Sequence, residues 1–271
     1  PFTSSVAAAV AALALTRIAG TAALFVLVWR QIRQSGSWSP SRRHLQNIVA
    51  AGWWINIAVM AGAALAYADR FVLGSLLSLS DVAFYSTPQE LIGRLTVVPV
   101  ALSSVLLPAL GSAGVRDPGD VVRLFSQGMT YTFAILFPIA AAGAAFSPEW
   151  LQLWLGTTFS AQSAHATQWL LLSVVLQSLA ITPLNLLQAV GRARVTAWLQ
   201  IVQVPIFIIG LWVAVPRFGI DGAAFVWAAR MLLDVTALTV VCRRHVAGLG
   251  SVTTRWMFAA PATAVWFVMV V

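Results

Sequence analysis

The chain has 271 residues, of which 60% are hydrophobic and only 9% are charged. Because soluble domains carry about 25% charged residues, this composition excludes a water-soluble globular protein and indicates a lipid environment. The net charge of +8 comes from sixteen arginines without a lysine. They lie in short clusters between apolar runs, a distribution that indicates membrane topology and no nucleic-acid partner.

Cysteine and histidine give no sign of a metal or redox site. Cys242 is the only cysteine, which excludes a disulfide framework and a cysteine-based metal cluster. The histidines His44, His165 and His245 lie far apart at the ends of apolar segments. We therefore expect no metal and no cofactor. The chain opens at Pro1 without a basic leader, so we expect no signal peptide and a missing front part.

Long apolar segments predict an all-α, polytopic transmembrane bundle of about eight spans. A helix needs about 20 apolar residues to cross a membrane core of about 30 Å. The segments are continuous, without the alternation of a β-barrel strand. The second is too long for an upright helix and is expected to tilt, bend or project. The predicted spans are residues 6–29, 47–79, 83–111, 127–147, 166–190, 194–215, 220–241 and 254–271.

Two connectors carry patterns of their own. Asp117-Pro118-Gly119-Asp120 is typical of a helix start with proline at the first position, opening a short amphipathic stretch. Its Asp-x-x-Asp spacing also occurs in metal–diphosphate sites, but a single motif with proline inside fits a helix start better. Residues 149–162 contain Trp150 and Trp154 and are predicted to form an interfacial loop on the outer side.

Arginine bias predicts the orientation. If connector 30–46 faces the cytoplasm, only Arg70 and Arg217 fall on the outer side. Basic residues concentrate on the cytoplasmic side of membrane proteins, so we expect a multi-pass protein of the bacterial inner membrane with that connector inside. The cytoplasmic arginines are then Arg30, Arg33, Arg42, Arg43, Arg116, Arg123, Arg192, Arg194, Arg243, Arg244 and Arg255.

Charged residues inside the spans are the candidates for function. Each costs about 2.5–3.5 kcal/mol at the centre of a bilayer, so each should face a partner or a watery cavity. Asp69 and Arg70 are adjacent and point in different directions, so they need partners on other helices. The charges within spans are Arg17, Asp69, Arg70, Glu90, Arg94, Arg230 and Asp234.

Spacing suggests structural pairs among these charges. Glu90 and Arg94 are four residues apart in the favourable order on one helical face, and Arg230 and Asp234 share a face in the reverse order. Such pairs hold a bundle together or couple ion movement to transport. Arg17 either extends its side chain toward the interface or pairs with a part of the protein outside this chain.

An anion site is the alternative interpretation. Arginine makes forked contacts with phosphate and stays charged when desolvated, so a cavity with Arg70 and Arg94 suits a diphosphate. Polar residues within the spans either join helices or line a path for sugar. These are Asn56, Gln177, Asn185 and Gln188.

Several motifs resemble one family in order and spacing. They resemble the polysaccharide-biosynthesis flippases for lipid-linked oligosaccharides, of the multidrug, oligosaccharidyl-lipid and polysaccharide exporter superfamily. The resemblance covers roughly residues 45–245. Its motifs are Asp69-Arg70-Phe71-Val72-Leu73-Gly74, Asp81-Val82-Ala83-Phe84-Tyr85-Ser86, the stretch 101–110, Trp154-Leu155-Gly156, Gly191-Arg192-Ala193-Arg194, and the stretch 218–224.

The resemblance implies two six-helix lobes around a cavity and transport by alternating access. Residues 1–45 would hold the last helix of the N-terminal lobe and a linker, 46–245 the C-terminal lobe, and 246–271 an extra helix. The implied partners are a lipid-linked glycan, membrane lipids and the missing N-terminal lobe. Arg70, Arg94 and Arg230 would hold the diphosphate, with Asn56 lining the substrate path.

Three other functions fit the composition less well. A drug or small-molecule antiporter of the same superfamily would have fewer arginines and a more acidic or aromatic cavity. A membrane-embedded polymerase or ligase would need a large outer loop with catalytic acids or histidines, and the longest one here has only Glu149 and His165. A structural or scramblase-like protein would not need paired charges within the membrane. We therefore expect a transporter and not an enzyme.

Overall fold

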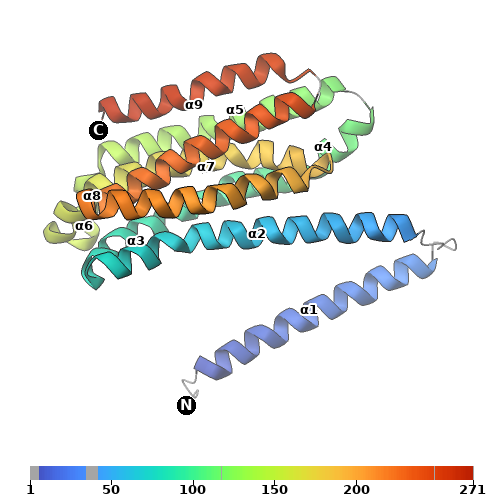
Figure 1. Ribbon diagram of the computed structural model, residues 1–271, viewed down its shortest axis with the longest axis horizontal. Helices are drawn as coiled ribbons and strands as arrows, with labels where there is room; N and C mark the ends of the chain where they lie inside the picture. The colour runs from blue at the N-terminus through green and yellow to red at the C-terminus, as the bar shows by residue number, and fades with distance from the viewer. Residues whose placement is uncertain (1–5, 35–41, 117, 247, 271) are drawn as a thin grey trace. The chain divides into compact units, whose positions relative to one another are not determined.

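All regular structure in the described residues is helical, which confirms the all-α prediction (Figure 1). The computed structural model describes residues 6–34, 42–116, 118–246 and 248–270. Six helices there are long and apolar enough to cross a membrane. The elements are α1 (Val6–Gln34), α2 (Arg42–Leu76), α3 (Leu79–Gly93), the 3₁₀ turn η1 (Arg94–Thr96), α4 (Val97–Arg116), α5 (Pro118–Ala145), α6 (Ser147–Leu155), α7 (Thr157–Ala189), α8 (Ala193–His245) and α9 (Gly250–Val270).

The chain divides into two compact units, Pro1–Ala50 and Ala51–Val271. The first unit holds α1, whose described side chains are exposed and mostly apolar. Phe25 stacks on Trp29 with ring centroids 6.0 Å apart, and Arg33 lies 5.7 Å from the centre of the Trp29 ring. A helix that is apolar all round is buried in protein or in lipid, as expected for a membrane span.

Helix α7 is the centre of the second unit. It contacts α3, α4, α5, α6, α8 and α9, and it is the most buried of the six candidate spans. Its central segment, 170–176, is buried on every side. A helix buried all round needs apolar residues on every face, which explains why Ser173 is the single polar residue in that segment, with its hydroxyl bonded to the Leu170 carbonyl.

Helix α8 is a helical hairpin that reverses at Gly219. This glycine has φ 58° and ψ −138°, a conformation in which only glycine is comfortable. On either side of it the two halves lie against each other, since Gln203 bonds to Asp234 and the rings of Phe207 and Trp227 meet edge-on at 5.5 Å. The two halves therefore match the separate spans predicted at 194–215 and 220–241.

Four predicted segments differ in the structure. Span 83–111 contains the 3₁₀ turn η1, where the Thr96 hydroxyl donates to the Gly93 carbonyl at 2.7 Å and the helix tightens.

The outer loop 149–162 is instead α6 and the start of α7, which pack against each other and are joined by a hydrogen bond from the Ser160 hydroxyl to the Pro148 carbonyl. The helix start predicted at residues 117–120 is found at Pro118, where α5 begins and runs on unbroken through span 127–147. Asp117 lies outside the described residues. Segment 254–271 forms α9, which is outside the set of six apolar helices found among the described residues.

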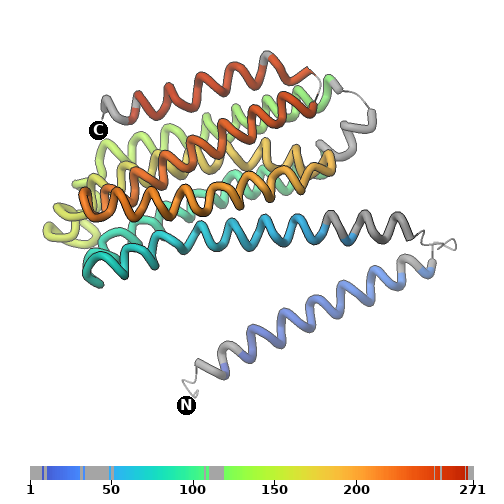
Figure 2. The backbone as a smooth tube through the Cα atoms, viewed as in Figure 1, coloured from blue at the N-terminus to red at the C-terminus, as the bar shows by residue number. Residues whose placement is uncertain are grey.

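The ends of the second unit differ in charge. At one end α5 begins beside the α8–α9 connector (Figure 2). There the Cys242 thiol near the end of α8 donates to the Pro183 carbonyl of α7. At the opposite end lie α6, the start of α7 and the turn at Gly219, where His165 and Asp221 are 3.3 Å apart. The first end carries Arg123, Arg192, Arg194, Arg243, Arg244 and Arg255, and the second carries Arg217.

Candidate functional site

Asp69 is the buried centre of a polar cluster between α2 and α3. The box formed by Ser78 and Asp81 starts α3 and fixes its first turn. Tyr85 and Gln89 are four residues apart on α3, so both face α2. The Tyr85 hydroxyl donates to Asp69 Oδ2 at 2.9 Å and the Gln89 amide donates to the same oxygen at 2.7 Å. Tyr85 and Asp69 have no exposed surface.

Arg70 forms the half-exposed edge of the same cluster. Its guanidinium lies 3.1 Å from the Glu90 carboxylate, and its Nε donates to Gln89 Oε1 at 3.5 Å. The side chains of Arg70 and Glu90 are 31% and 63% exposed. Asp69 and Arg70 thus both find partners on another helix, as their adjacency predicted. Glu90 pairs with Arg70 of α2 and not with Arg94, which lies in the 3₁₀ turn that follows α3.

Arg230 and Asp234 are buried in the α8 hairpin, with 9% and 8% of their surface exposed. The Arg230 guanidinium lies 5.5 Å from the centre of the Phe207 ring and 5.2 Å from that of Trp227. The Gln203 amide donates to Asp234 at 2.8 Å. The described side chains include no carboxylate within 4.0 Å of Arg230, and its Nε has no hydrogen-bond partner there.

Arg230 lies beside the first cluster. Its guanidinium lies 5.2 Å from the centre of the Trp227 ring, and Trp227 lines one cavity together with Gln89, which bonds to Asp69. The structure therefore brings together charges from α2, α3 and α8. We call Asp69, Arg70, Tyr85, Gln89, Glu90, Gln203, Arg230 and Asp234 the charge network. A guanidinium that is desolvated without a close counter-ion is a costly arrangement, which is typical of a functional site.

Three predicted site residues stand apart from the charge network. Asn56 is exposed, and its amide donates to the carbonyl of Gly52 in its own helix at 2.9 Å. Arg94 is exposed in η1 and takes part in no ion pair recorded for the described residues. Arg17 is exposed in the first unit, and it is not placed relative to the second.

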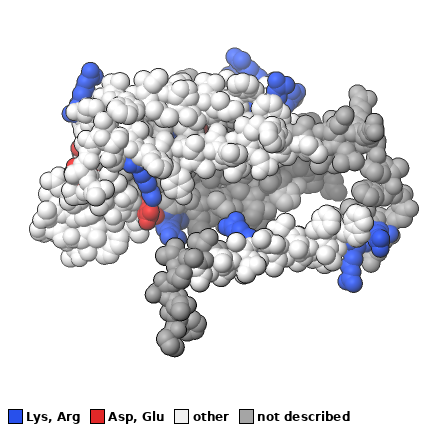
Figure 3. All heavy atoms as spheres, turned by 60° about the horizontal axis from the view of Figure 1, so that its bottom comes forward, with Lys and Arg blue, Asp and Glu red and all other residues white. Residues whose placement is uncertain are grey.

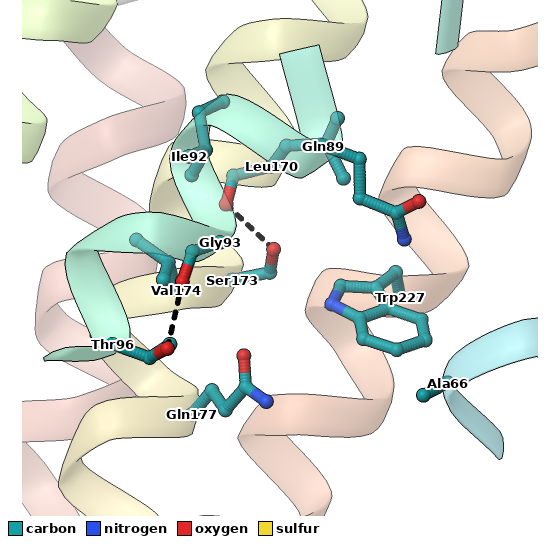
Figure 4. Close-up of a pocket in the computed structure, with 10 residues that line it drawn as sticks. All are labelled: Ala66, Gln89, Ile92, Gly93, Thr96, Leu170, Ser173, Val174, Gln177 and Trp227. Carbon is teal, nitrogen blue, oxygen red and sulfur yellow. Dashed lines mark hydrogen bonds between the residues drawn. The ribbon is translucent and has the colours of Figure 1, made fainter. Parts of the chain in front are cut away.

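A small cavity adjoins the charge network (Figure 4). Its volume is about 180 Å³, and α2, α3, η1, α7 and α8 all contribute to its walls. Gln89 belongs to both the wall and the charge network. The lining residues are Ala66, Gln89, Ile92, Gly93, Thr96, Leu170, Ser173, Val174, Gln177 and Trp227.

Comparison with known proteins gives the family. The sequence profile described as polysaccharide biosynthesis protein matches residues 4–164, more than half of the chain. The chain belongs to this family. A protein of Shigella flexneri named "Putative O-antigen transporter" is 26% identical over 237 residues, which are 88% of this chain and 56% of that protein. The chain thus spans about half the length of the curated relative it matches. No solved structure matches the chain.

Membership of the polysaccharide biosynthesis family confirms the resemblance seen in the sequence motifs. Together with the six long apolar helices, it makes the chain a multi-pass membrane protein. Figure 3 agrees, because most of the described side chains on the face that it shows are uncharged and the charged ones lie at a few places. In the described ranges, no three His, Cys, Asp or Glu side chains come together to hold a metal ion.

The sequence alone did not single out four members of this site. Tyr85 and Gln89 lie four residues apart on one helical face, a signal that was available. Trp227 lies three residues before Arg230 on the same arm of α8, so that spacing was a signal as well. Gln203 contacts Asp234 only because α8 reverses at Gly219. Since sequence spacing does not report contacts between hairpin arms, Gln203 could be found only in the structure.

Proposed function

We propose that the chain is the C-terminal part of a flippase that moves a polyprenyl-diphosphate-linked glycan across the inner membrane by alternating access. Arg70 is the observation that carries this proposal. It lies within the apolar length of α2 and is only 31% exposed, yet it faces a carboxylate that is 63% exposed. A charged arginine within the membrane costs free energy, and a cavity that binds an anionic substrate would offset that cost.

The pairing of Arg70 suggests how a diphosphate is held and released. Arginine presents a planar fork that matches phosphate oxygens, and Glu90 neutralises that fork when the site is empty. A diphosphate would displace the exposed Glu90 from Arg70 while Gln89 keeps the guanidinium in place. Arg230 adds positive charge from inside the bundle, and Arg94 is free to approach substrate from η1. The proposal includes no covalent step, so no catalytic residue is assigned.

The larger assembly is part of the same proposal. Residues 1–45 would end an N-terminal lobe, 46–245 would form the C-terminal lobe, and 246–271 would be an extra helix. The arginine-rich end of the second unit, with connector 30–46, would face the cytoplasm of a bacterial cell. Substrate would enter from that side and leave on the other, and the N-terminal lobe would complete the cavity. The name of the Shigella relative supports a role in transport for this assembly.

Substitutions at Arg70 test the proposal. The full-length parent is expressed in a flippase-deleted strain, and surface glycan is measured at matched protein levels. We expect Arg70→Gln to lower glycan by about 10- to 100-fold, since a charged hydrogen-bonded contact contributes about 1.5–3 kcal/mol. Arg70→Lys should fall between, because lysine keeps the charge and loses the fork.

A surface ion pair serves as the control. Arg123 lies 3.0 Å from Asp120 at the start of α5, with both side chains largely exposed. We expect Arg123→Gln to leave glycan export unchanged, since such pairs contribute little. If the Arg70→Gln protein exports glycan at the full level, Arg70 does not hold the diphosphate. If the unmodified parent does not restore surface glycan, the flippase assignment itself is wrong.

A further inference from the structure

The cavity beside the charge network is lined by neutral hydrogen-bonding groups, two of which lack protein partners (Figure 4). Among the described residues, neither the Trp227 indole N–H nor the Gln177 amide has a recorded hydrogen bond. Trp227 is only 7% exposed, and Gln177 is half-buried. Figure 4 shows the indole nitrogen and the Gln177 amide on the cavity side. A ligand in the cavity would gain a hydrogen bond from each group, and a typical hydrogen bond contributes about 0.5–1.5 kcal/mol.

Two hydroxyl groups of the lining offer acceptors. The Ser173 hydroxyl donates to the Leu170 carbonyl at 2.7 Å, and the Thr96 hydroxyl donates to the Gly93 carbonyl at 2.7 Å. Because each hydroxyl hydrogen is used in this way, the oxygen's remaining lone pairs are left for an incoming donor. The cavity thus presents both donors and acceptors, and its lining residues include no charged side chain.

We propose that this cavity binds a neutral sugar ring, namely the sugar bonded directly to the diphosphate of the lipid carrier. Ring hydroxyls donate and accept hydrogen bonds on all sides, as these walls require. The volume of about 180 Å³ is below the roughly 300–1,000 Å³ of sites for drug-sized ligands, so it takes one ring and not an oligosaccharide. This inference rests on the flippase function proposed above.

Gln89 places that ring next to the phosphate site. Its side chain lines the cavity, and its Oε1 accepts from Arg70 Nε at 3.5 Å. A diphosphate on Arg70 would therefore have its attached sugar within reach of Gln177 and Trp227. An acidic sugar is disfavoured, since its carboxylate would enter a cavity whose lining has no cation to pair with it. The cavity accordingly selects for a neutral first sugar.

Two near-isosteric substitutions remove the key hydrogen-bonding groups. Gln177→Met removes the amide at similar volume, and Trp227→Phe removes the N–H while keeping a ring against Arg230. The matched controls are Gln162→Met, at an exposed site on the same helix, and Trp212→Phe, at a tryptophan that is 52% exposed. All four are made in the full-length parent, and a thermal melt in detergent checks that each is folded.

The probes are methyl glycosides prepared by methanolysis of the surface polysaccharide of the organism that makes this protein. Each is titrated singly into the detergent-solubilised protein, and binding is followed by saturation-transfer NMR. We expect at least one neutral glycoside to bind to the unmodified protein. Each cavity variant should bind that glycoside about tenfold more weakly, because each has lost one hydrogen bond to it. The two control variants should bind it as the unmodified protein does.

Three results would overturn the sugar site: no glycoside binds, only acidic glycosides bind, or the cavity variants bind as tightly as the controls. Surface glycan in the flippase-deleted strain is measured on the same set of proteins. If the unmodified parent restores glycan while the cavity variants bind and export normally, the sugar site fails and the flippase function stands. If the unmodified parent restores none, the flippase function fails, whatever the cavity binds.

Discussion

Asp69 shows how single residues make a buried carboxylate acceptable between two membrane helices. Its side chain has no exposed surface and accepts hydrogen bonds from Tyr85, Gln89 and the Arg70 backbone N–H. Each bond satisfies a lone pair that lipid could not satisfy. Arg70 remains available at the edge, so the same cluster has a structural half around Asp69 and a more exposed half around Arg70.

The hydrogen bonds around Asp69 lead to a prediction for Tyr85→Phe. The change removes one donor to a buried acid, so we expect a loss of about 1–3 kcal/mol. That corresponds to roughly 2–4 °C in Tm per kcal/mol for a unit of this size. Cys242, the single cysteine, is fully buried, so its reaction with a thiol-specific dye during heating reports unfolding. Tyr131→Phe, at a tyrosine that is 54% exposed, should leave Tm unchanged. Equal Tm values for the two variants would show that the Tyr85 bond contributes nothing.

At the scale of single residues, the sequence predicted which charged residues need a partner better than it predicted which residues those partners are. The cost of charge in lipid identified Asp69, Arg70, Arg230 and Asp234, and adjacency showed that the first two required another helix. The i,i+4 rule then paired Glu90 with Arg94, whereas in the structure Glu90 forms its ion pair with Arg70. That rule counts neighbours on one helix only, and Arg70 reaches Glu90 from α2. Local spacing cannot anticipate which neighbouring helix supplies a partner.

Among the elements, the α8 hairpin depends most on one residue. Gly219 has a positive φ that an L side chain rarely adopts, and a Cβ there would meet no atom within 4 Å. A substitution at this position therefore tests backbone strain without a steric clash. The turn also sets Arg230 and Trp227 on the second arm against Phe207 on the first, so strain at Gly219 should reach the charge network.

We expect Gly219→Ala to cost about 1–3 kcal/mol, the strain of a non-glycine residue in this region. Gly74→Ala is the matched control, because Gly74 is helical and its added Cβ would also meet nothing within 4 Å. Alanine is favoured over glycine within a helix by about 0.5–1 kcal/mol, so this control should raise Tm slightly. The two changes should thus move the melting temperature in opposite directions. A Gly219→Ala protein as stable as Gly74→Ala would mean that the turn tolerates an L residue without strain.

For the molecule as a whole, apolar length alone predicted nearly all of the architecture. The segments at 194–215 and 220–241 match the two arms of α8, and 166–190 overlaps the central helix α7, which ends at Ala189. The 3₁₀ turn η1 and the helix α6 were not predicted, since apolar length does not report a change of helix type or a short helix held by a bond such as that from Ser160 to Pro148. The neutral cavity escaped prediction for a related reason: five elements meet to form it, and each contributes one or a few residues.

The arginine asymmetry between the two ends of the second unit leads to a prediction about orientation. Val190, at the arginine-rich end, is 42% exposed, and Leu153 in α6, at the opposite end, is 89% exposed. Each is replaced by cysteine in turn and treated with a membrane-impermeant maleimide in intact spheroplasts of a bacterial host. Because basic connectors stay inside, Leu153→Cys should be labelled at once and Val190→Cys only after the membrane is permeabilised. The unmodified protein is the blank, since Cys242 is buried. The reverse pattern would place the arginine-rich end outside, and a cytoplasmic entry route for the substrate would then be untenable.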